Sequence, residues 1–459
     1  MTLIQRRIIM IIFILAFFIL APILIFYASG YRFDLKRKKV LRTGTLMVEA
    51  KDIKDAQLYI NDQRYEKPFD KKIFIYNLLP GEYNIKLTKE GYYSWSKKIT
   101  INSGLTTFAK DVILFQDNIP LQIIDGQISN FKISPDWQKI IYVIQKQPFS
   151  ELYVYDLNNK NNTLLYRISQ INKIKLSWAA SSKKILFNFN DNYLVFDVNN
   201  TNQAKDLNQL LDFQPQKINW DISSDNLLYA NKQKSIWQID LVSQTSQLLF
   251  ETEKNINPEF FIEANDIFYI QREDNRDVLF KYNLNFNTNK KISALNRSDN
   301  YKFIESSNNF IGLLDLDLQK LFLIQKVITD RETNISREEP IQEFDAKHAV
   351  WDNNEKQLLI YNDFEITTYN TGTGEKTFIN RYGQEIKKID WYPNLNYIII
   401  LFETKIEIID LILGNGVRNS TQLVEFDQLN DFYLDEKGEN IYFNGQIGKQ
   451  QGIYRLEIK

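Results

Sequence analysis

The stretch Ile133–Val143, ISPDWQKIIYV, decides the fold because its pattern recurs along the C-terminal three quarters of the chain. In each copy an apolar anchor residue is followed by a polar turn, and an apolar strand begins seven residues after the anchor. Self-similarity at a fixed period is the signature of a repeat architecture. The eight anchors are Ile133, Trp178, Trp220, Phe260, Phe303, Trp351, Trp391 and Leu434. The strands that follow begin at Ile140, Ile185, Leu227, Ile267, Phe310, Leu358, Ile398 and Ile441.

The spacing of the anchors predicts a β-propeller. Successive anchors lie 40 to 48 residues apart, close to the roughly 40–45 residues of a four-stranded propeller blade. The constant offset of seven indicates a tight hairpin with turns such as Ser134-Pro135-Asp136 and Asp435–Gly438. Residues 119–459 therefore predict a propeller of eight blades. Seven blades are the alternative, because Gly312 interrupts the strand of the fifth copy and a long polar loop, Gln325–Pro340, follows it.

The two ends of the repeat array predict how the ring closes. The last copy stops at Gly452–Leu456, one strand short of a four-stranded blade, and an unpaired strand, Ile119–Ile124, precedes the first copy. Unpaired strand edges invite aggregation, and pairing the two ends of the array removes them. We expect Ile119–Ile124 to be the outer strand of the last blade.

The N-terminus predicts a single transmembrane helix whose partner is the lipid bilayer. Ile8–Tyr27 is an unbroken apolar run of 20 residues, and a helix of this length covers roughly 30 Å, the thickness of a bilayer core. Residues 1–7 form a short basic tail before it, and residues 28–43 form a basic juxtamembrane linker after it. A cleaved signal peptide is the alternative, but the apolar core of such peptides usually spans only about 7–15 residues.

Charge is divided unevenly along the chain. Residues 1–43 carry a net charge of +7 and the remainder −8, although the whole chain has −1. The acidic body disfavours nucleic acid, because binding phosphates requires concentrated Lys and Arg. Six basic residues follow the span, and the positive-inside rule then places the large domain in the cytoplasm. A short tail with Arg6-Arg7 is equally the usual start of a signal anchor. Lys36–Lys39 lies either against anionic headgroups or in a solvated linker.

Residues 44–115 predict a small antiparallel β-sandwich. Apolar residues alternate at Leu46 and Val48 and again at Ile85 and Leu87, with a turn at Pro80-Gly81 between them. About seventy residues of short strands and turns suffice for two small packed sheets.

The same residues resemble the PEGA domain, a surface-associated β module. The resemblance rests on Gly44-x-Leu46-x-Val48, Ala56–Asp62, Leu79–Tyr83 and Gly91-Tyr92-x-x-Trp95, and it ends at Gly104. It implies an extracytoplasmic location, which we weigh above the charge count. We therefore expect a single-pass protein of the cytoplasmic membrane with its C-terminal domains outside the cytoplasm.

The composition excludes several kinds of site. Cysteine is absent and His348 is the one histidine, which removes thiol nucleophiles, disulfides and metal sites that need two imidazoles. A lone histidine beside a strand is more often structural than catalytic. We predict no catalytic residue, no cofactor and no metal site, and we expect the anchor tryptophans and Trp95 to lie in the core.

Polar residues close the second strand of every copy, at Asp156, Asp197, Asp240, Asn283, Gln325, Asn370, Asp410 and Glu457. An active site needs one such group at one place, whereas turns need one in every repeat. Their recurrence therefore predicts turn hydrogen bonds.

The repeat also resembles the WD-repeat and TolB-type β-propellers, a likeness of architecture that does not carry function. Together the patterns predict a mainly β, membrane-anchored cell-surface protein with a non-catalytic binding or scaffold function. One propeller face would hold a protein, a peptide or an envelope glycan. Two alternatives remain open: a propeller-based enzyme, such as a glycan hydrolase with two carboxylates, and a scaffold that faces the cytoplasm.

Overall fold

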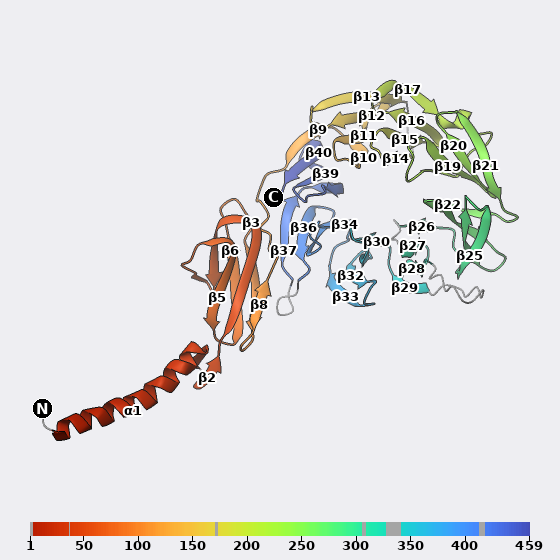
Figure 1. The fold of residues 1–459 in the computed structure, drawn as a ribbon. Coiled ribbons are helices and arrows are strands. Elements are labelled where there is room, and N and C mark those ends of the chain that lie inside the picture. The colour runs from red at the N-terminus through yellow and green to blue at the C-terminus, as the bar shows by residue number, and fades with distance from the viewer. Residues whose placement is uncertain (1–2, 36, 170–172, 305–308, 327–340, 413–417) are drawn as a thin grey trace.

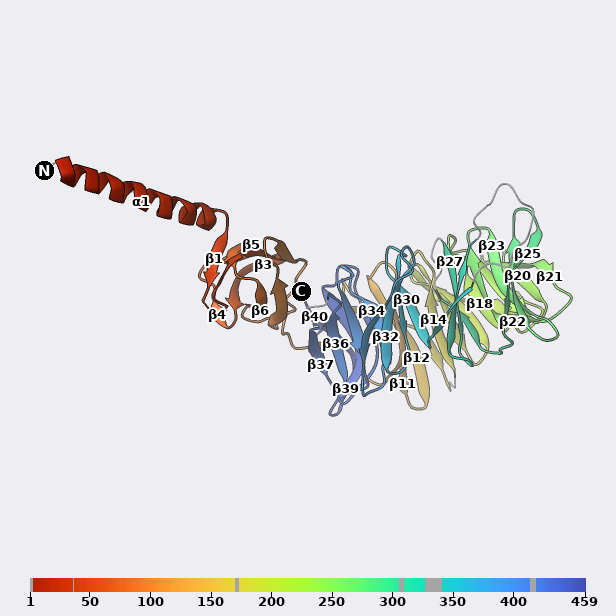
Figure 2. The same ribbon diagram turned by 90° about the horizontal axis from the view of Figure 1, so that it is seen from below.

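The chain forms a helix, a small β-domain and a ring of β-sheets, which follow one another in space as they do in sequence (Figures 1 and 2). The computed structural model describes residues 3–35, 37–169, 173–304, 309–326, 341–412 and 418–459. The helix projects from the end of the β-domain that is opposite the ring (Figure 2). The C-terminus lies where the β-domain meets the ring (Figure 1).

Helix α1 (Leu3–Ala28) contains the predicted span and extends it at both ends. Arg6 and Arg7, expected in a separate tail, already belong to the helix, and none of its residues is buried. The helix is long and apolar enough to cross a membrane.

Residues 28–43 differ from the open linker that the sequence predicts. Strands β1 (Tyr31–Asp34) and β2 (Lys39–Arg42) pair antiparallel, with Phe33 opposite Val40. Lys38 adopts a positive φ of 52° in the turn. Local cross-strand pairing therefore orders a segment whose charge density suggested a solvated chain.

The β-domain is built around one long strand that belongs to two sheets. The N-terminal part of β3 pairs with β5 and, in parallel, with β8, whereas its C-terminal part pairs with β4 and β6. The two sheets enclose a core that includes Leu46, Ile85 and Trp95, the last 6 % exposed as predicted. The parallel β3–β8 pair corrects the expectation of a wholly antiparallel sandwich. The strands are β3 (Gly44–Ile60), β4 (Gln63–Arg64), β5 (Phe69–Leu78), β6 (Gly81–Thr88), β7 (Trp95–Ile101) and β8 (Thr106–Ala109).

The ring is a β-propeller of eight four-stranded sheets, counted over the described residues. Blade 1 consists of β10 (Ile128–Ile133), β11 (Lys139–Lys146), β12 (Phe149–Asp156) and β13 (Asn161–Ile168). Blade 2 consists of β14 (Ile174–Trp178), β15 (Lys184–Phe189), β16 (Asn192–Asp197) and β17 (Asn200–Asp206), followed by a short 3₁₀ helix, η1 (Leu207–Gln209). Blade 3 consists of β18 (Lys217–Trp220), β19 (Leu227–Lys232), β20 (Ser235–Asp240) and β21 (Thr245–Glu251). Blade 4 consists of β22 (Ile256–Glu263), β23 (Asp266–Arg272), β24 (Asp277–Asn283) and β25 (Thr288–Leu295).

The second half of the ring repeats this order. Blade 5 consists of β26 (Tyr301–Phe303), β27 (Phe310–Asp315), β28 (Lys320–Gln325) and β29 (Ile341–Asp345). Blade 6 consists of β30 (His348–Trp351), β31 (Gln357–Tyr361), β32 (Glu365–Asn370) and β33 (Lys376–Arg381). Blade 7 consists of β34 (Lys388–Trp391), β35 (Tyr397–Leu401), β36 (Lys405–Asp410) and β37 (Ser420–Glu425). Blade 8 consists of β38 (Gln428–Leu434), β39 (Asn440–Ile447), β40 (Gln450–Glu457) and β9 (Leu121–Asp125).

The ring closes as the sequence predicts. Strand β9, which covers most of the expected Ile119–Ile124, pairs antiparallel with β40, so that Ile124 lies opposite Ile453. Blade 8 also contacts blade 1 directly, because the Tyr433 hydroxyl donates to the Phe131 carbonyl oxygen at 3.4 Å. These contacts leave eight blades and exclude the seven-bladed alternative.

The predicted hairpin offset of seven holds in five blades. The anchor lies opposite the residue seven positions later in blades 1, 2, 6, 7 and 8, as in Ile133–Ile140 and Trp391–Ile398. In blades 3, 4 and 5 the register is longer, and Phe303 of blade 5 lies opposite Leu313. The offset thus locates the hairpin in every blade. In blade 4 the pairing is shifted because the strand continues past the anchor to Glu263, which lies opposite Asp266.

The fifth copy forms a complete blade, contrary to the interruption expected at Gly312. This glycine lies inside β27, and the side chain of Ile304 occupies the space that a β-carbon at position 312 would need. Gly312 therefore permits close packing within the strand instead of ending it. Most of the predicted loop Gln325–Pro340 lies outside the described residues.

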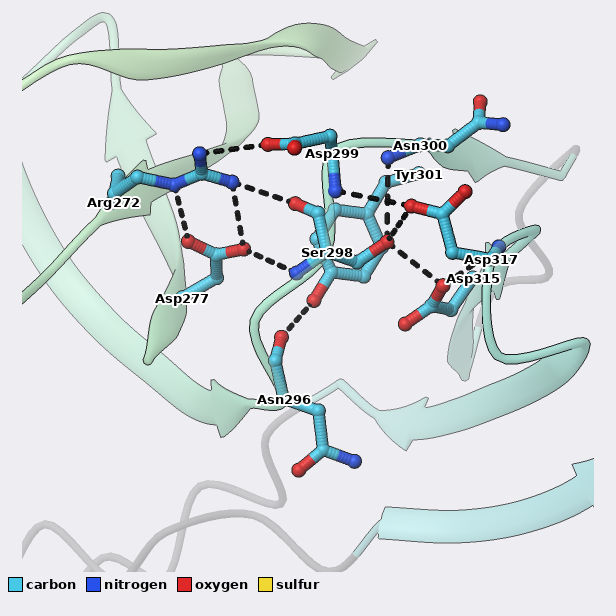
Figure 3. A network of polar contacts seen from close by, with 9 residues as sticks. All are labelled: Arg272, Asp277, Asn296, Ser298, Asp299, Asn300, Tyr301, Asp315 and Asp317. Carbon is cyan, nitrogen blue, oxygen red and sulfur yellow. Dashed lines mark hydrogen bonds and ion pairs between the residues drawn. The ribbon is translucent and has the colours of Figure 1, made fainter. Parts of the chain in front are cut away.

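A polar network joins blade 5 to blade 4 (Figure 3). Arg272 at the end of β23 pairs with Asp277 at 3.2 Å and donates to the Ser298 carbonyl oxygen at 2.7 Å. The Ser298 amide donates to Asp277, and its hydroxyl donates to Asp315 of blade 5 at 2.8 Å. Asp277 and Asp315 are almost fully buried, so this network connects the two blades together with an apolar cluster that includes Leu279 and Leu313.

Glu151 provides a second buried charge, in blade 1. Its side chain is 3 % exposed, and it pairs with Lys146 at 3.0 Å and Arg167 at 2.6 Å. Lys146, Tyr153 and Arg167 lower the pKa of the Glu151 carboxyl to about 2.

We predict that Glu151 makes propeller stability depend on acid pH. Because its pKa is lower in the folded state, its contribution is present above pH about 4.5 and is lost as the pH falls towards about 2. The Glu151→Gln variant should be less stable than the parent at pH 7, and the difference should shrink in acid when urea midpoints are compared. The Glu365→Gln variant, at an exposed ion pair with Arg381, should show a small, nearly pH-independent difference; equal pH dependence of both would contradict the prediction.

The sandwich is docked firmly onto blade 7. The Phe115 ring lies edge-on to the rings of Tyr392 and Tyr397, at 5.5 and 5.4 Å. Lys97 of β7 forms a buried ion pair with Asp410 of β36, with 2.8 Å between Nζ and Oδ2. The Gln116 amide donates to the Ile458 carbonyl oxygen at 2.9 Å. Apolar packing and a desolvated ion pair thus connect the two domains.

Candidate functional site

Six of the eight polar residues predicted to form turns do so, each at the end of the third strand of its blade. Their side-chain oxygens accept hydrogen bonds from backbone amides two or three residues later, for example Asp240 from Val242 at 2.7 Å and Asn370 from Gly372 at 3.0 Å. The same contact occurs at Asp156, Asp197, Asn283 and Asp410. Gln325 is followed by residues outside the described ranges, and Glu457 ends the last strand. These groups stabilise turns and do not converge on one site.

The anchor tryptophans pack between blades. The Trp178 indole N–H donates to the Lys132 carbonyl oxygen at 3.4 Å, and the Trp391 indole N–H donates to the Val350 carbonyl oxygen at 3.0 Å. Each acceptor lies on the first strand of the preceding blade. Trp351 is 9 % exposed, and the indole nitrogens of Trp220 and Trp351 are buried. Trp351 and Trp391 are thus buried as predicted, whereas Trp178 and Trp220 are partly buried and pack against the edge of the core.

The inner strands bring a set of lysines to the centre of the ring. The first strands of several neighbouring blades contact one another, for example β10 with β14 and β22 with β26, and they face the middle of the propeller in Figure 1. One and three residues before the anchors, these strands carry Lys132, Lys175, Lys217, Lys302 and Lys388. The acidic residues at the same positions are Glu259, Asp390 and Asp431, and the histidine is His348.

A cavity of about 390 Å³ opens along the inner strands of blades 1, 2 and 3. Three lysines line it: Lys132, Lys175 and Lys217. Its other polar groups are the amides of Asn130, Asn188, Gln216 and Asn219 and the hydroxyls of Ser177 and Tyr193. The described lining contains no carboxylate. We call these residues the lysine pocket. Its chemistry suits a ligand that carries negative charge and hydroxyl groups.

Two of the pocket lysines are not in an ion pair, although the Asp431 carboxylate attracts one of them, Lys132. Within the described part of the chain, Lys132 and Lys175 form no ion pair, whereas Lys217 pairs with Glu259 at 2.5 Å. Burial lowers the pKa of the Lys132 ammonium, and the nearby charges of Lys388 and Lys302 lower it further against the opposing effect of Asp431. The Tyr433 ring lies 5.5 Å from Lys132 Nζ and 4.1 Å from Lys388 Nζ. Like charges held together in a partly buried space are typical of a binding site.

The acidic residues on the first strands of the blades form ion pairs and hydrogen bonds. Glu259 binds Lys217, and Asp431 binds Lys388 at 2.7 Å. The Asp390 carboxylate accepts a hydrogen bond from the Trp391 amide at 2.8 Å. These contacts stabilise the inner strands.

His348 lies on an inner strand, where the sequence predicted a structural or exposed residue. Its ring stacks on that of Tyr361, with 4.9 Å between centroids. Burial lowers the pKa of His348, as do the charges of Lys302 and Lys347, while Asp363 raises it. No hydrogen bond joins this imidazole to a carboxylate in the described residues, and they contain no group of three His, Asp or Glu placed to hold a metal.

The sequence reasoning missed the lysine pocket, although a signal for it is present. Five of the eight repeats carry a lysine one or three residues before the anchor, for example Lys132 and Lys175. These lysines come together only because the strand that ends at the anchor is the innermost strand of each blade, which the sequence does not reveal.

Comparison with known proteins shows the fold and no family. No protein-family profile matches the chain, and no curated protein is significantly similar to it in sequence. The PEGA assignment of residues 44–115 therefore stays a prediction. A solved structure of the Dos1 propeller matches with a TM-score of 0.52 and 13 % identity, over 75 % of this chain and 96 % of that one. A eukaryotic initiation factor matches with a TM-score of 0.50 and 11 % identity, over 79 % and 96 % of the two chains. At such identities the likeness establishes one thing about this chain, which is that it contains a β-propeller.

Proposed function

We propose that this chain is a membrane-anchored, non-catalytic binding protein whose propeller holds an anionic, hydroxyl-rich ligand in the lysine pocket. Helix α1 would cross the cytoplasmic membrane once, with the sandwich and propeller outside the cytoplasm. An envelope polysaccharide that carries phosphate or carboxylate groups has the required chemistry. The propeller fold itself is typical of binding scaffolds.

The observation that carries this proposal is the pairing pattern of the pocket. Lys132 and Lys175 form no ion pair in the described residues, although the Asp431 carboxylate attracts Lys132. Their cavity is lined by amides and hydroxyls together with the aliphatic side chains of Ile174, Leu176, Leu186 and Ile218. Amide and hydroxyl groups donate and accept hydrogen bonds and so match sugar hydroxyls, while ammonium groups match phosphate or carboxylate. A rigid strand scaffold positions these groups before the ligand arrives, which lowers the entropic cost of binding.

The enzyme alternative has less support from the channel. A glycoside hydrolase needs two carboxyl groups about 5–10 Å apart on either side of the scissile bond, one of them free to donate a proton. Glu259 and Asp431 are instead held by lysines.

We predict that the lysine pocket binds acidic glycans. The full chain in nanodiscs should bind poly(glycerol phosphate) or polygalacturonate but not neutral dextran when measured by titration calorimetry. Replacing either Lys132 or Lys175 with Gln should weaken binding about tenfold, the equivalent of about 1.4 kcal/mol. The affinity should also fall as salt concentration rises, because the ligand is held by charge.

Lys160→Gln is the matched control, because Lys160 is an exposed residue in the outer turn of blade 1. An equal loss of glycan affinity in the Lys160→Gln and Lys132→Gln variants would mean that binding depends on overall charge and not on the pocket. Binding of acidic peptides in preference to both glycans would identify a protein ligand.

Membrane orientation is tested separately, and the absence of cysteine makes this direct. Asn159 lies in the exposed outer turn of blade 1, so an Asn159→Cys variant offers one accessible thiol. Labelling of intact cells by a membrane-impermeant maleimide is expected if the propeller is outside. Labelling only after lysis would replace the surface function with a cytoplasm-facing scaffold.

A further inference from the structure

The β1–β2 hairpin is tied closely to the end of helix α1. The Gly30 carbonyl oxygen accepts two hydrogen bonds from Thr43, one from its amide and one from its hydroxyl, both at 2.8 Å. Arg32 donates to the Tyr27 carbonyl oxygen at 2.7 Å, and its guanidinium lies 3.6 Å from the centre of the Tyr27 ring. The hairpin therefore stays within a short distance of the last turn of the helix.

The hairpin is also fixed to the sandwich. Arg32 donates to the side chain of Asn77 on β5 at 3.2 Å, and β2 continues through Thr43 directly into β3. Helix end, hairpin and sandwich thus form one connected unit, as Figure 2 shows for α1, β1 and β3. If the helix crosses a bilayer, the hairpin lies at the depth of the lipid headgroups.

The exposed surface of the hairpin combines apolar and basic side chains. Phe33 and Val40 are cross-strand neighbours and are 56 % and 57 % exposed, and Leu35 is 81 % exposed. The exposed basic residues are Arg37, Lys38, Lys39 and Arg42. Exposed large apolar side chains are unusual in water on a hairpin whose two strands have four residues each, since such hairpins have little core of their own.

We propose that the β1–β2 hairpin docks on the anionic lipid headgroups that surround helix α1, and so fixes the orientation of the sandwich and propeller relative to the membrane. Phe33, Leu35 and Val40 enter the headgroup layer, as interfacial apolar residues do. The basic residues attract anionic phospholipid, whose surface potential acts within a Debye length of the bilayer. This inference rests on the membrane anchoring in the proposed function, and it adds a second contact with the lipid.

Single-cysteine reporters in the full-length protein test the proposal. A polarity-sensitive fluorophore is placed at Phe18→Cys in the helix, at Val40→Cys in the hairpin or at Asn159→Cys on the propeller. Each protein is inserted into nanodiscs of phosphatidylcholine alone or mixed with phosphatidylglycerol. We expect the Phe18 probe to report an apolar environment in both discs and the Asn159 probe to report water in both. The Val40 probe should shift to shorter wavelength, and most strongly in the anionic discs.

A triple variant tests whether docking of the hairpin depends on its basic residues. Replacing Arg37, Lys38 and Lys39 with Gln should reduce the shift of the Val40 probe in anionic discs to its value in neutral discs. A control triple variant at Lys183, Lys234 and Lys437, all exposed on the propeller, should leave the shift unchanged.

The possible failures are distinguishable. A Val40 probe that reports water in both discs, or an equal shift in both, overturns headgroup docking while the helix stays anchored. A Phe18 probe that reports water overturns the anchoring, and with it both the membrane part of the proposed function and this inference.

Discussion

Replacing Lys97 with methionine is expected to destabilise the joint between sandwich and propeller by about 3–5 kcal/mol. The Lys97 and Asp410 side chains are 6 % and 2 % exposed, and the Lys97 ammonium also donates to the Ile412 carbonyl oxygen. Without its partner, the Asp410 carboxylate stays buried and unpaired against the sandwich, and such a charge is very costly. Urea unfolding should show a new early transition, and the Ile113 and Gln116 amides should exchange faster with solvent.

A neighbouring residue provides the matched control for this prediction. Lys98 pairs with Glu82 at 2.7 Å, but both side chains are more than half exposed, so Lys98→Met should cost only about 0–1 kcal/mol. The double variant Lys97→Met/Asp410→Asn should lose less than the sum of its single variants, because it removes both charges. Asparagine retains an oxygen for the Ile412 amide. Equal costs for Lys97→Met and Lys98→Met would show that the buried pair does not hold the joint.

Replacing Arg272 with methionine is expected to cost about 3 kcal/mol, at the lower end of the range for a broken buried ion pair, because the arginine is itself one third exposed. The variant leaves Asp277, whose side chain is 2 % exposed, without a cation. The Ser298 carbonyl oxygen also loses its donor. Because the Ser298 hydroxyl also donates to Asp315, the loss of stability should extend to blade 5 (Figure 3).

The measurement for Arg272→Met is the urea midpoint together with amide exchange in blades 4 and 5. Arg381→Met is the matched control, since Arg381 and Glu365 are 3.6 Å apart and largely exposed. It should shift the midpoint little. Arg272→Lys should recover part of the stability, because a lysine keeps the charge but lacks the planar fork that reaches two acceptors. A uniform effect on all eight blades would contradict a local role for the network.

How much of the fold the sequence predicted depends on how local each feature is. The hairpin of blade 1 follows from Ser134-Pro135-Asp136 and the apolar residues beside it, and it was correct. The β1–β2 hairpin was missed because dense positive charge hides the pairing of Phe33 with Val40. Gly312 was misread because its role depends on Ile304, which packs over it only in the folded blade.

The candidate site depended on the fold even more strongly. Lys132, Lys175 and Lys217 are about forty residues apart in sequence, and only the stacking of blades 1, 2 and 3 against one another lines one cavity with all three. Asp410 was correctly predicted to cap a turn, but its second partner, Lys97, lies 313 residues earlier. A turn contact is local and visible in the sequence, whereas an ion pair between domains is not.

The sequence by itself determined the repeat, the eight anchors, the closure of the ring and the apolar helix. The repeat and the anchors follow from periodicity, the helix follows from a continuous run of apolar residues, and the closure follows from an incomplete last repeat and an unpaired strand before the first. The tertiary structure alone decided which lysines meet in the channel, which charges are buried at the joint and how the hairpin is fixed to the helix. Coulombic interactions and desolvation depend on distance in space, and chain position does not record that distance.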